Sequence, residues 1–200
     1  MNARQIILAI LISAIAVGIA IAQDWDKEQL ENSPRHHEWV QVESGGRTIH
    51  CFLTYPEVSH KAGVVVVIHE NRGLNDWARS IADQIAGLGY ITIAPDLLSG
   101  KAPGGGKTSD FPDSDAARTA IYELDGDQVL VDLNAVADYA AALPAASGEV
   151  AVAGFCWGGS QSFRFATAHD SLKAAFVFYG TAPQDAEAIA QINCPVYGFY

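Results

Sequence analysis

Short runs of apolar residues alternate along the chain with longer segments in which apolar positions recur every three or four residues. The clearest run, Val64-Val65-Val66-Val67, consists of β-branched residues, which is typical of a strand buried on both faces of a parallel sheet. Similar runs occupy residues 90–94, 150–153, 174–179 and 195–200. Strands that alternate with helices predict a mostly parallel sheet that is covered on both faces.

Apolar spacing and capping residues between these runs predict the helices. Residues 75–87 place apolar side chains along one helical face. Asp113 or Ser114 can cap the helix that follows them, and Asp127 can cap a later helix that runs to about Leu143.

Turn residues mark the remaining segments. Two short strands, residues 38–42 and 48–55, meet around Gly45-Gly46, a pair typical of a hairpin turn. This hairpin is expected to add antiparallel strands to one edge of the sheet. Residues 99–109 are rich in Gly, Lys and Pro and are expected to form a loop, and residues 24–34 are expected to form an irregular arm.

The first residues have the pattern of a secretory signal peptide. Arg4 precedes an uncharged apolar run from Ile6 to Ala22, and Ala20-Ile21-Ala22 is a cleavage site of the A-x-A type. The run has 17 residues, just short of a comfortable membrane span. We expect cleavage after the run, a periplasmic or secreted protein, and one domain over residues 23–200. An uncleaved membrane anchor is the alternative to the signal peptide of residues 1–22.

Composition narrows the classes of partner. Half of the residues are hydrophobic, and the formal net charge is −11 at pH 7 with no run of Lys and Arg, so a nucleic acid is not an expected partner. Gly104–Thr108 is similar to part of a phosphate loop, but it lacks the G-x-x-x-x-G-K-[ST] spacing. The histidines at 36, 37 and 50 lack the spacing of metal ligands. We therefore expect no metal and no cofactor.

The three cysteines leave one unpaired in an exported protein. Cys51 and Cys194 could form a disulfide only if their Cα atoms came within about 7 Å of each other. We expect both to be small buried residues in strands instead. Cys156 should stay free if it is a nucleophile.

The segment around Cys156 is the most informative part of the sequence. It reads Gly-Phe-Cys-Trp-Gly-Gly, with Gly154 and Gly158 two residues before and after the cysteine, and it follows the apolar run 150–153. This is the G-x-S-x-G pattern of a nucleophile elbow, with cysteine in place of serine. The turn is strained, which favours small neighbours, and the helix N-terminus behind it favours the reactive thiolate. A structural cysteine in a glycine-rich loop is the alternative.

Other segments extend this pattern, notably His-Glu-x-x-Gly at residues 69–73. The segments concerned are residues 66–74, 89–97, 154–159, 178–180 and 194–200. With them, the chain resembles the dienelactone hydrolases of the α/β-hydrolase superfamily from about Arg35 to its end. Most of that superfamily uses serine and lacks this glutamate. The resemblance implies the α/β-hydrolase three-layer sandwich, with a mostly parallel sheet and an N-terminal antiparallel hairpin.

The resemblance also implies roles for individual residues. Cys156 is the nucleophile that forms an acyl-enzyme with an ester or lactone, and Glu70 lies beside it and helps to activate the thiol. A carboxylate placed there can accept the thiol proton. The backbone N–H groups of Trp157 and Asn71 form the oxyanion hole. Arg72 is a candidate contact for an anionic substrate, with a surface role as the alternative.

Alternatives remain open around the glutamate. Glu70 could instead pair with Arg72, and His69 is expected to be a histidine whose bonds are satisfied at the end of its strand. In the family, an arginine after the Pro-Asp-Leu segment helps to bind the carboxylate of the substrate. Gly100 and Lys101 stand in that stretch here, which is a departure from the family pattern.

The acid and the histidine of the family's triad follow strands that begin near or beyond Pro195. The only histidine after Cys156 is His169, 13 residues along the chain. In a helix this separation is about 20 Å, too far to reach the sulfur. The given sequence thus lacks the triad Asp and His, and we expect it to be C-terminally truncated. The sequence predicts a hydrolase that cleaves a small ester or lactone through a cysteine acyl-enzyme; a catalytically silent binding protein of the same fold is the alternative.

Overall fold

The structure of the chain is a computed structural model in which residues 25–200 are described. The expected signal peptide, residues 1–22, lies outside these residues. Residues 25–31 form a helix, so the prediction of an irregular arm is wrong for that stretch. Within the described part of the chain, none of the helices combines the length and the apolar character needed to cross a membrane.

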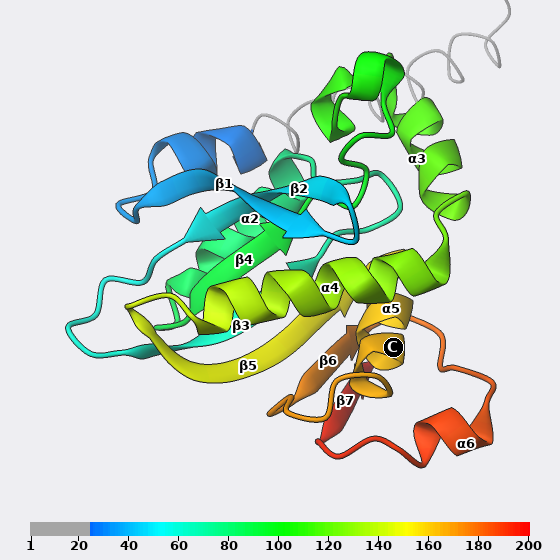
Figure 1. The fold of residues 1–200 in the computed structure, drawn as a ribbon. Coiled ribbons are helices and arrows are strands. Elements are labelled where there is room, and N and C mark those ends of the chain that lie inside the picture. The colour runs from blue at the N-terminus through cyan, green and yellow to red at the C-terminus, as the bar shows by residue number, and fades with distance from the viewer. Residues whose placement is uncertain (1–24) are drawn as a thin grey trace, which may run out of the picture.

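A seven-stranded sheet forms the centre of the molecule, in the order β1-β2-β4-β3-β5-β6-β7 (Figure 1). The strands are β1 His37–Ser44, β2 Arg47–Thr54, β3 Ala62–Ile68, β4 Ile91–Pro95, β5 Ala146–Phe155, β6 Ala175–Phe178 and β7 Val196–Phe199. β2 is antiparallel to both β1 and β4, and the other neighbouring pairs are parallel. The mostly parallel sheet with an N-terminal hairpin at one edge is confirmed.

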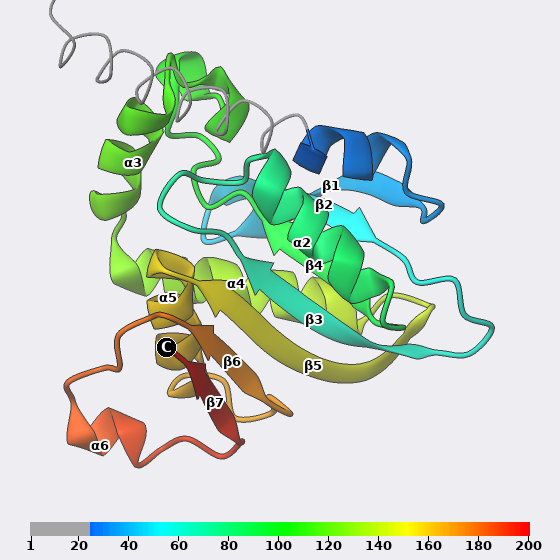
Figure 2. The same cartoon turned by 180° about the vertical axis from the view of Figure 1, so that it is seen from behind.

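Helices cover both faces of this sheet. One face carries α2, and the other carries α4 and α5, as the two opposite views in Figure 1 and Figure 2 show. The helices are α2 Asp76–Ala86, α3 Ser114–Tyr122, α4 Gly126–Ala141, α5 Trp157–Ala166 and α6 Ala186–Ile189. The loop predicted at residues 99–109 contains two short 3-10 turns, Pro103–Gly105 and Thr108–Asp110.

Two apolar cores hold the three layers together. Leu133, Val136 and Phe165 of α4 and α5 are fully buried against one face of the sheet. Ala78 and Ala82 of α2 are buried against the other face. Burying one large apolar side chain contributes about 1.5–3 kcal/mol, so these cores fix the strand ends that carry the site.

The cap of α4 differs from the sequence prediction. Asp125, rather than Asp127, precedes the helix, and its carboxylate accepts the N–H groups of Asp127 and Gln128 at 2.8 and 3.2 Å. The side chain of Asp127 instead pairs with Arg164 of α5 at 2.6 Å. Asp125 and Asp127 are two residues apart, and because Asp127 pairs with α5, Asp125 caps α4. The cap predicted for α3 is present, with Asp113 in that position.

A buried carboxylate ties the segment before β1 to α2. Asp83 is fully buried and accepts hydrogen bonds from Ser33 at 2.6 Å and from Nε of Arg35 at 2.8 Å. Nε2 of His37 lies 2.7 Å from the same carboxylate. Burial would raise the pKa of Asp83, but these three partners hold it below its usual range. The start of the hairpin is thereby fixed to the helix that follows the loop after β3.

The carboxyl ends of β3, β5 and β6 lie side by side at one edge of the sheet, because these strands are parallel neighbours. The chain leaves these strands at Ile68, Phe155 and Phe178. Loops that leave this edge are where α/β folds bind their ligands. The residues selected from the sequence follow the first two of these three ends.

Candidate active site

The turn after β5 presents Cys156 at the start of α5. Cys156 has φ 55° and ψ −117°, a conformation that is strained for any residue but glycine. Its N–H donates to the carbonyl oxygen of Phe178 at 3.0 Å, and its side chain is half-buried. The sulfur stands at the N-terminus of a ten-residue helix, whose first backbone N–H groups have no acceptor within the helix. The strand, turn and helix expected around Cys156 are present.

The two glycines that bracket the cysteine are required by close approach. A Cβ on Gly158 would lie 2.3 Å from the carbonyl oxygen of His69, and a Cβ on Gly154 would lie 2.1 Å from the carbonyl oxygen of Gly158. Neither glycine has a positive φ. The strain that the sequence suggested is thus carried by Cys156 itself, and the glycines allow α5 to begin directly against the ends of the strands.

His69 is held in a structural position, as expected. It is fully buried, its Nδ1 lies 2.7 Å from the carbonyl oxygen of Glu70, and its Nε2 accepts the N–H of Leu97 at 3.4 Å. Burial lowers the pKa of His69. The ring is stacked on Trp157, with centroids 5.8 Å apart. A neutral imidazole with both nitrogens occupied supports the start of α5.

Two backbone N–H groups are available for an oxyanion. The N–H groups of Asn71 and Trp157 donate to no other residue in the range 25–200. Trp157 is the first residue of α5, and Asn71 belongs to the loop after β3, the strand next to β5. The side-chain amide of Asn71 donates to the hydroxyl of Tyr122 at 3.2 Å, which holds that loop to the end of α3.

Glu70 is bound by a tyrosine that the sequence analysis did not select. The hydroxyl of Tyr179 donates to Oε1 of Glu70 at 2.8 Å. Within the described residues, the Glu70 carboxylate makes no ion pair with Arg72 and no hydrogen bond with the sulfur of Cys156. Tyr179 is 51% exposed, and its partial burial and this bond to Glu70 raise its pKa above the usual range.

The other cysteines and the late histidine take no part in this arrangement. Cys51 is fully buried in β2, Cys194 is half-buried just before β7, and all three cysteines are free. Burial raises the pKa of both the Cys51 and the Cys194 thiols. His169 lies beyond the far end of α5, where Nδ1 is 2.7 Å from the side-chain oxygen of Asn134.

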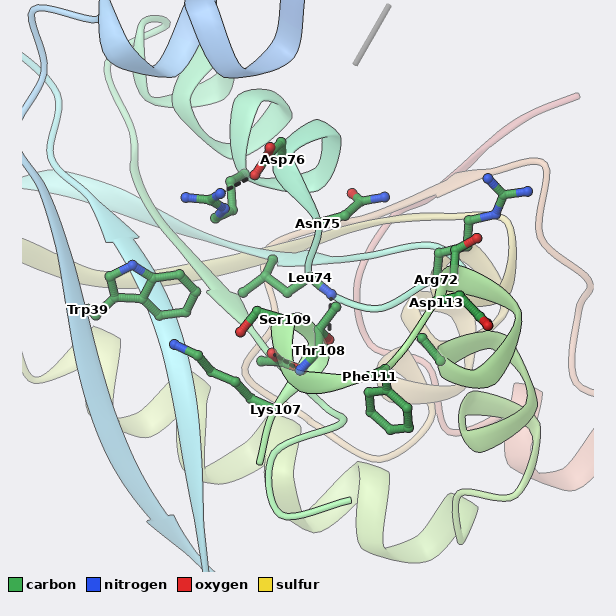
Figure 3. A pocket seen from close by; sticks show the side chains of 14 residues that line it. Trp39, Arg72, Leu74, Asn75, Asp76, Lys107, Thr108, Ser109, Phe111 and Asp113 are labelled. Carbon is green, nitrogen blue, oxygen red and sulfur yellow. Dashed lines mark hydrogen bonds and ion pairs between the residues drawn. The ribbon is translucent and has the colours of Figure 1, made fainter. Parts of the chain in front are cut away.

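A cavity of about 520 Å³ opens beside the loop after β3 (Figure 3). Its walls come from β1, from that loop and the start of α2, and from residues 107–117. Neither Cys156 nor Glu70 lines it, although Arg72 does. The cavity therefore adjoins the loop that carries the candidate site without containing the sulfur.

The carboxylates that line this cavity have protein partners, whereas two of its cationic side chains have no carboxylate partner. Asp76 pairs with Arg79, Asp96 accepts bonds from Thr108 and from the N–H of Leu98, and Asp113 caps α3. Arg72 and Lys107 have no carboxylate within 4.0 Å among the described residues. Lys107 lies instead over the ring of Trp39, 4.2 Å from its centroid.

Comparison with known proteins gives the family. Residues 49–200 match the model of the "Dienelactone hydrolase family". The chain belongs to the dienelactone hydrolase family. This is a family of hydrolases, and the α/β-hydrolase fold predicted from the sequence is confirmed.

Three relatives illustrate the likeness. The chain is 31% identical to the Salmonella typhi protein named "Putative carboxymethylenebutenolidase", over 80% of this chain and 62% of that protein. It is 30% identical to "Carboxymethylenebutenolidase 1" of Cupriavidus pinatubonensis, over 70% of this chain and 59% of that protein. A solved structure, the dienelactone hydrolase-like promiscuous phosphotriesterase P91 from metagenomic libraries, has 27% identity and a TM-score of 0.68, and the match covers 82% of this chain and 67% of that one. The chain spans about three fifths of the two carboxymethylenebutenolidases it matches.

Two residues of this dienelactone hydrolase family member became visible only in the structure. Tyr179 lies in the Phe-Tyr-Gly segment that carried the resemblance, but nothing in that segment indicates a contact with Glu70. Lys107 belongs to the Gly104–Thr108 stretch, which is similar to part of a phosphate loop but lacks its spacing. Lys101, which belongs to the stretch where the resemblance implies a substrate-binding arginine, does not line the cavity next to the site.

Proposed function

We propose that this protein hydrolyses a small ester or lactone through a thioester on Cys156. The observation that carries the proposal is the positive φ of Cys156 at the start of α5, together with the N–H groups of Asn71 and Trp157, which have no acceptor within residues 25–200. A cysteine needed only for packing has no reason to occupy a strained position at a helix N-terminus.

The proposed reaction has two steps. Glu70 accepts the thiol proton, and the sulfur attacks the carbonyl carbon of the substrate. The negative oxygen that forms is stabilised by the N–H groups of Asn71 and Trp157. Collapse of this intermediate expels the alcohol or opens the lactone, with return of a proton, and leaves an acyl group on the sulfur. Water then cleaves the thioester and restores the thiol. Aryl-ester turnover by the full-length gene product, compared with its Cys156→Ala variant, tests the proposal.

The cavity of Figure 3 suggests the class of substrate. Its carboxylates already have protein partners, whereas Arg72 and Lys107 have no carboxylate partner among residues 25–200. An unpaired cation beside a cavity favours an anionic group of a ligand. We propose that the acyl part of the substrate carries a carboxylate, which Arg72 and Lys107 contact while the ester lies at Cys156.

Replacing Lys107 with glutamine should weaken binding of such a substrate. We expect KM for an aryl ester with an acidic acyl chain to rise about three- to tenfold, since one charge-assisted contact at a partly exposed site is lost. KM for a neutral ester of similar size should hardly change. Steady-state kinetics of both esters measure the effect, and Arg72→Gln should act in the same direction.

Lys61→Gln is the matched control for this charge change. Lys61 is an exposed lysine directly before β3, at the end of that strand opposite to the site, and it does not line the cavity. Its replacement should leave the preference between the two esters as it is. Equal KM changes for acidic and neutral esters in Lys107→Gln would count against the carboxylate contact.

We also propose that the protein is exported and that residues 1–22 are removed on the way. The apolar run with Arg4 before it and the A-x-A site at residues 20–22 support this proposal. N-terminal sequencing of the protein recovered from the periplasm or the medium should give Gln23 as the first residue. A protein that begins at Met1 would favour the membrane anchor.

A further inference from the structure

Three residues stand in a row above the carboxyl edge of the sheet. Glu70, Cys156 and Tyr179 follow the ends of β3, β5 and β6, and β5 is the middle strand of the three. The Tyr179 hydroxyl donates to Oε1 of Glu70 at 2.8 Å. This bond joins the outer two strand ends, so it passes across the end of the strand that carries the nucleophile.

The backbone of Tyr179 is fixed relative to the nucleophile turn. The N–H of Cys156 donates to the carbonyl oxygen of Phe178, the residue directly before Tyr179. The N–H of Tyr179 donates to the carbonyl oxygen of Phe199 at 2.7 Å. Gly180 packs so closely on α5 that a Cβ there would lie 2.3 Å from the carbonyl carbon of Gly159. Tyr179 has a positive φ of 41°, a costly conformation for a bulky residue. Cys156 and Tyr179 therefore form one rigid unit.

The Glu70 side chain has far less support of its own. It is half-buried in the loop after β3, and the bond from Tyr179 is the one hydrogen bond that its carboxylate makes to another described residue. A glutamate without such a bond samples many rotamers. A general base must be held within reach of the proton that it takes.

We propose that Tyr179 is a positioning residue for thiol activation, because it holds the Glu70 carboxylate over the nucleophile strand with one oxygen left free for the proton of Cys156. This inference rests on the role proposed above for Glu70. In the step concerned, the S–H bond breaks and its proton moves to Oε2 of Glu70, while Tyr179 keeps its own proton and continues to donate it. Burial and the neighbouring Glu70 and Cys156 raise the pKa of Tyr179, which suits a group that only donates.

Alkylation of Cys156 by iodoacetamide tests this role without an ester substrate. The rate is followed at pH 7 in the full-length gene product by peptide mapping, which separates Cys156 from the other two cysteines. Tyr179→Phe removes only the hydroxyl and should slow alkylation about tenfold, a part of the 10²- to 10⁴-fold that a positioned base contributes. Glu70→Gln should slow it at least as much.

The double variant distinguishes positioning from any other effect of the tyrosine. If Tyr179 acts through Glu70, Tyr179→Phe should cause no further loss in the Glu70→Gln background. A loss of the same factor in both backgrounds would overturn the proposal, as would an unchanged rate in Tyr179→Phe. A general structural defect would appear as lower thermal stability and would slow alkylation in both backgrounds alike.

Tyr90→Phe is the matched control. Tyr90 is a partly exposed tyrosine directly before β4, at the opposite edge of the sheet, and its hydroxyl has no hydrogen-bond partner within residues 25–200. Its loss should leave the alkylation rate unchanged. A normal alkylation rate in Glu70→Gln would refute the role of Glu70 and this inference with it. The proposed ester reaction is tested separately, by acylation of Cys156 with an aryl ester.

Discussion

Replacing Cys156 with alanine is expected to abolish aryl-ester turnover, with a loss of at least about 10⁴-fold, because removal of a nucleophile leaves only the contribution of binding and of the oxyanion hole. The fold should be retained, since the side chain is half-buried and lies on a turn. Release of the phenol from an aryl ester, followed by absorbance, measures the loss. Intact mass after mixing should show an acyl adduct on the wild-type protein and none on the variant.

Cys194→Ala is the control for this experiment. Cys194 is a free, half-buried cysteine in the segment before β7, so its replacement should leave both turnover and the acyl adduct in place. Turnover that survives in Cys156→Ala would sink the thioester mechanism. A wild-type protein that binds esters and never becomes acylated would instead support the catalytically silent binding protein.

Gly158→Ala should be among the most destabilising single substitutions in the chain. Its Cβ would lie 2.3 Å from the carbonyl oxygen of His69 and 2.5 Å from that of Ile68. Both obstacles are backbone atoms at the end of a central strand, so α5 would have to move away from the sheet. Overpacking of this kind costs about 1–3 kcal/mol or more. Two backbone obstacles favour the upper end of this range, about 3 kcal/mol, which lowers the melting temperature of a protein of this size by about 6–12 °C.

Gly63→Ala makes the same chemical change at the other end of β3. The nearest atom to its Cβ would be 3.6 Å away, in the ring of Tyr90, and Gly63 has no positive φ. This variant should melt within about 2 °C of the wild type, because the loss of backbone freedom in the unfolded chain favours alanine. Similar melting temperatures for the two variants would contradict the close packing described for the nucleophile turn.

The parts of the site that the sequence predicted are those built by neighbouring residues. Cys156, its two bracketing glycines and the apolar run before it lie within ten residues, so the strand, the turn and the helix could be inferred from spacing alone. His69 was also interpreted correctly, because a histidine at the end of a buried strand has backbone groups close to both ring nitrogens.

The parts that were missed depend on contacts between distant segments. Glu70 and Tyr179 are 109 residues apart, and they meet because β3 and β6 flank β5, an order that apolar periodicity does not specify. Lys107 reaches the cavity because two 3-10 turns direct its loop toward Trp39. The residue type predicted for the cap of α4 was correct, but Asp127 pairs with Arg164 of α5 and Asp125 caps the helix two residues earlier.

The position of β3 between β4 and β5 has a consequence for how the chain is made. β4 follows β3 after about 20 residues, but β5 begins at Ala146, nearly 80 residues beyond Ile68. During synthesis, the edge of β3 that pairs with β5 therefore stays unpaired for several seconds. Such an edge can pair with other chains. Newly made protein should thus be most prone to aggregation before β5 leaves the ribosome, and a chaperone that covers β3 would act in that interval.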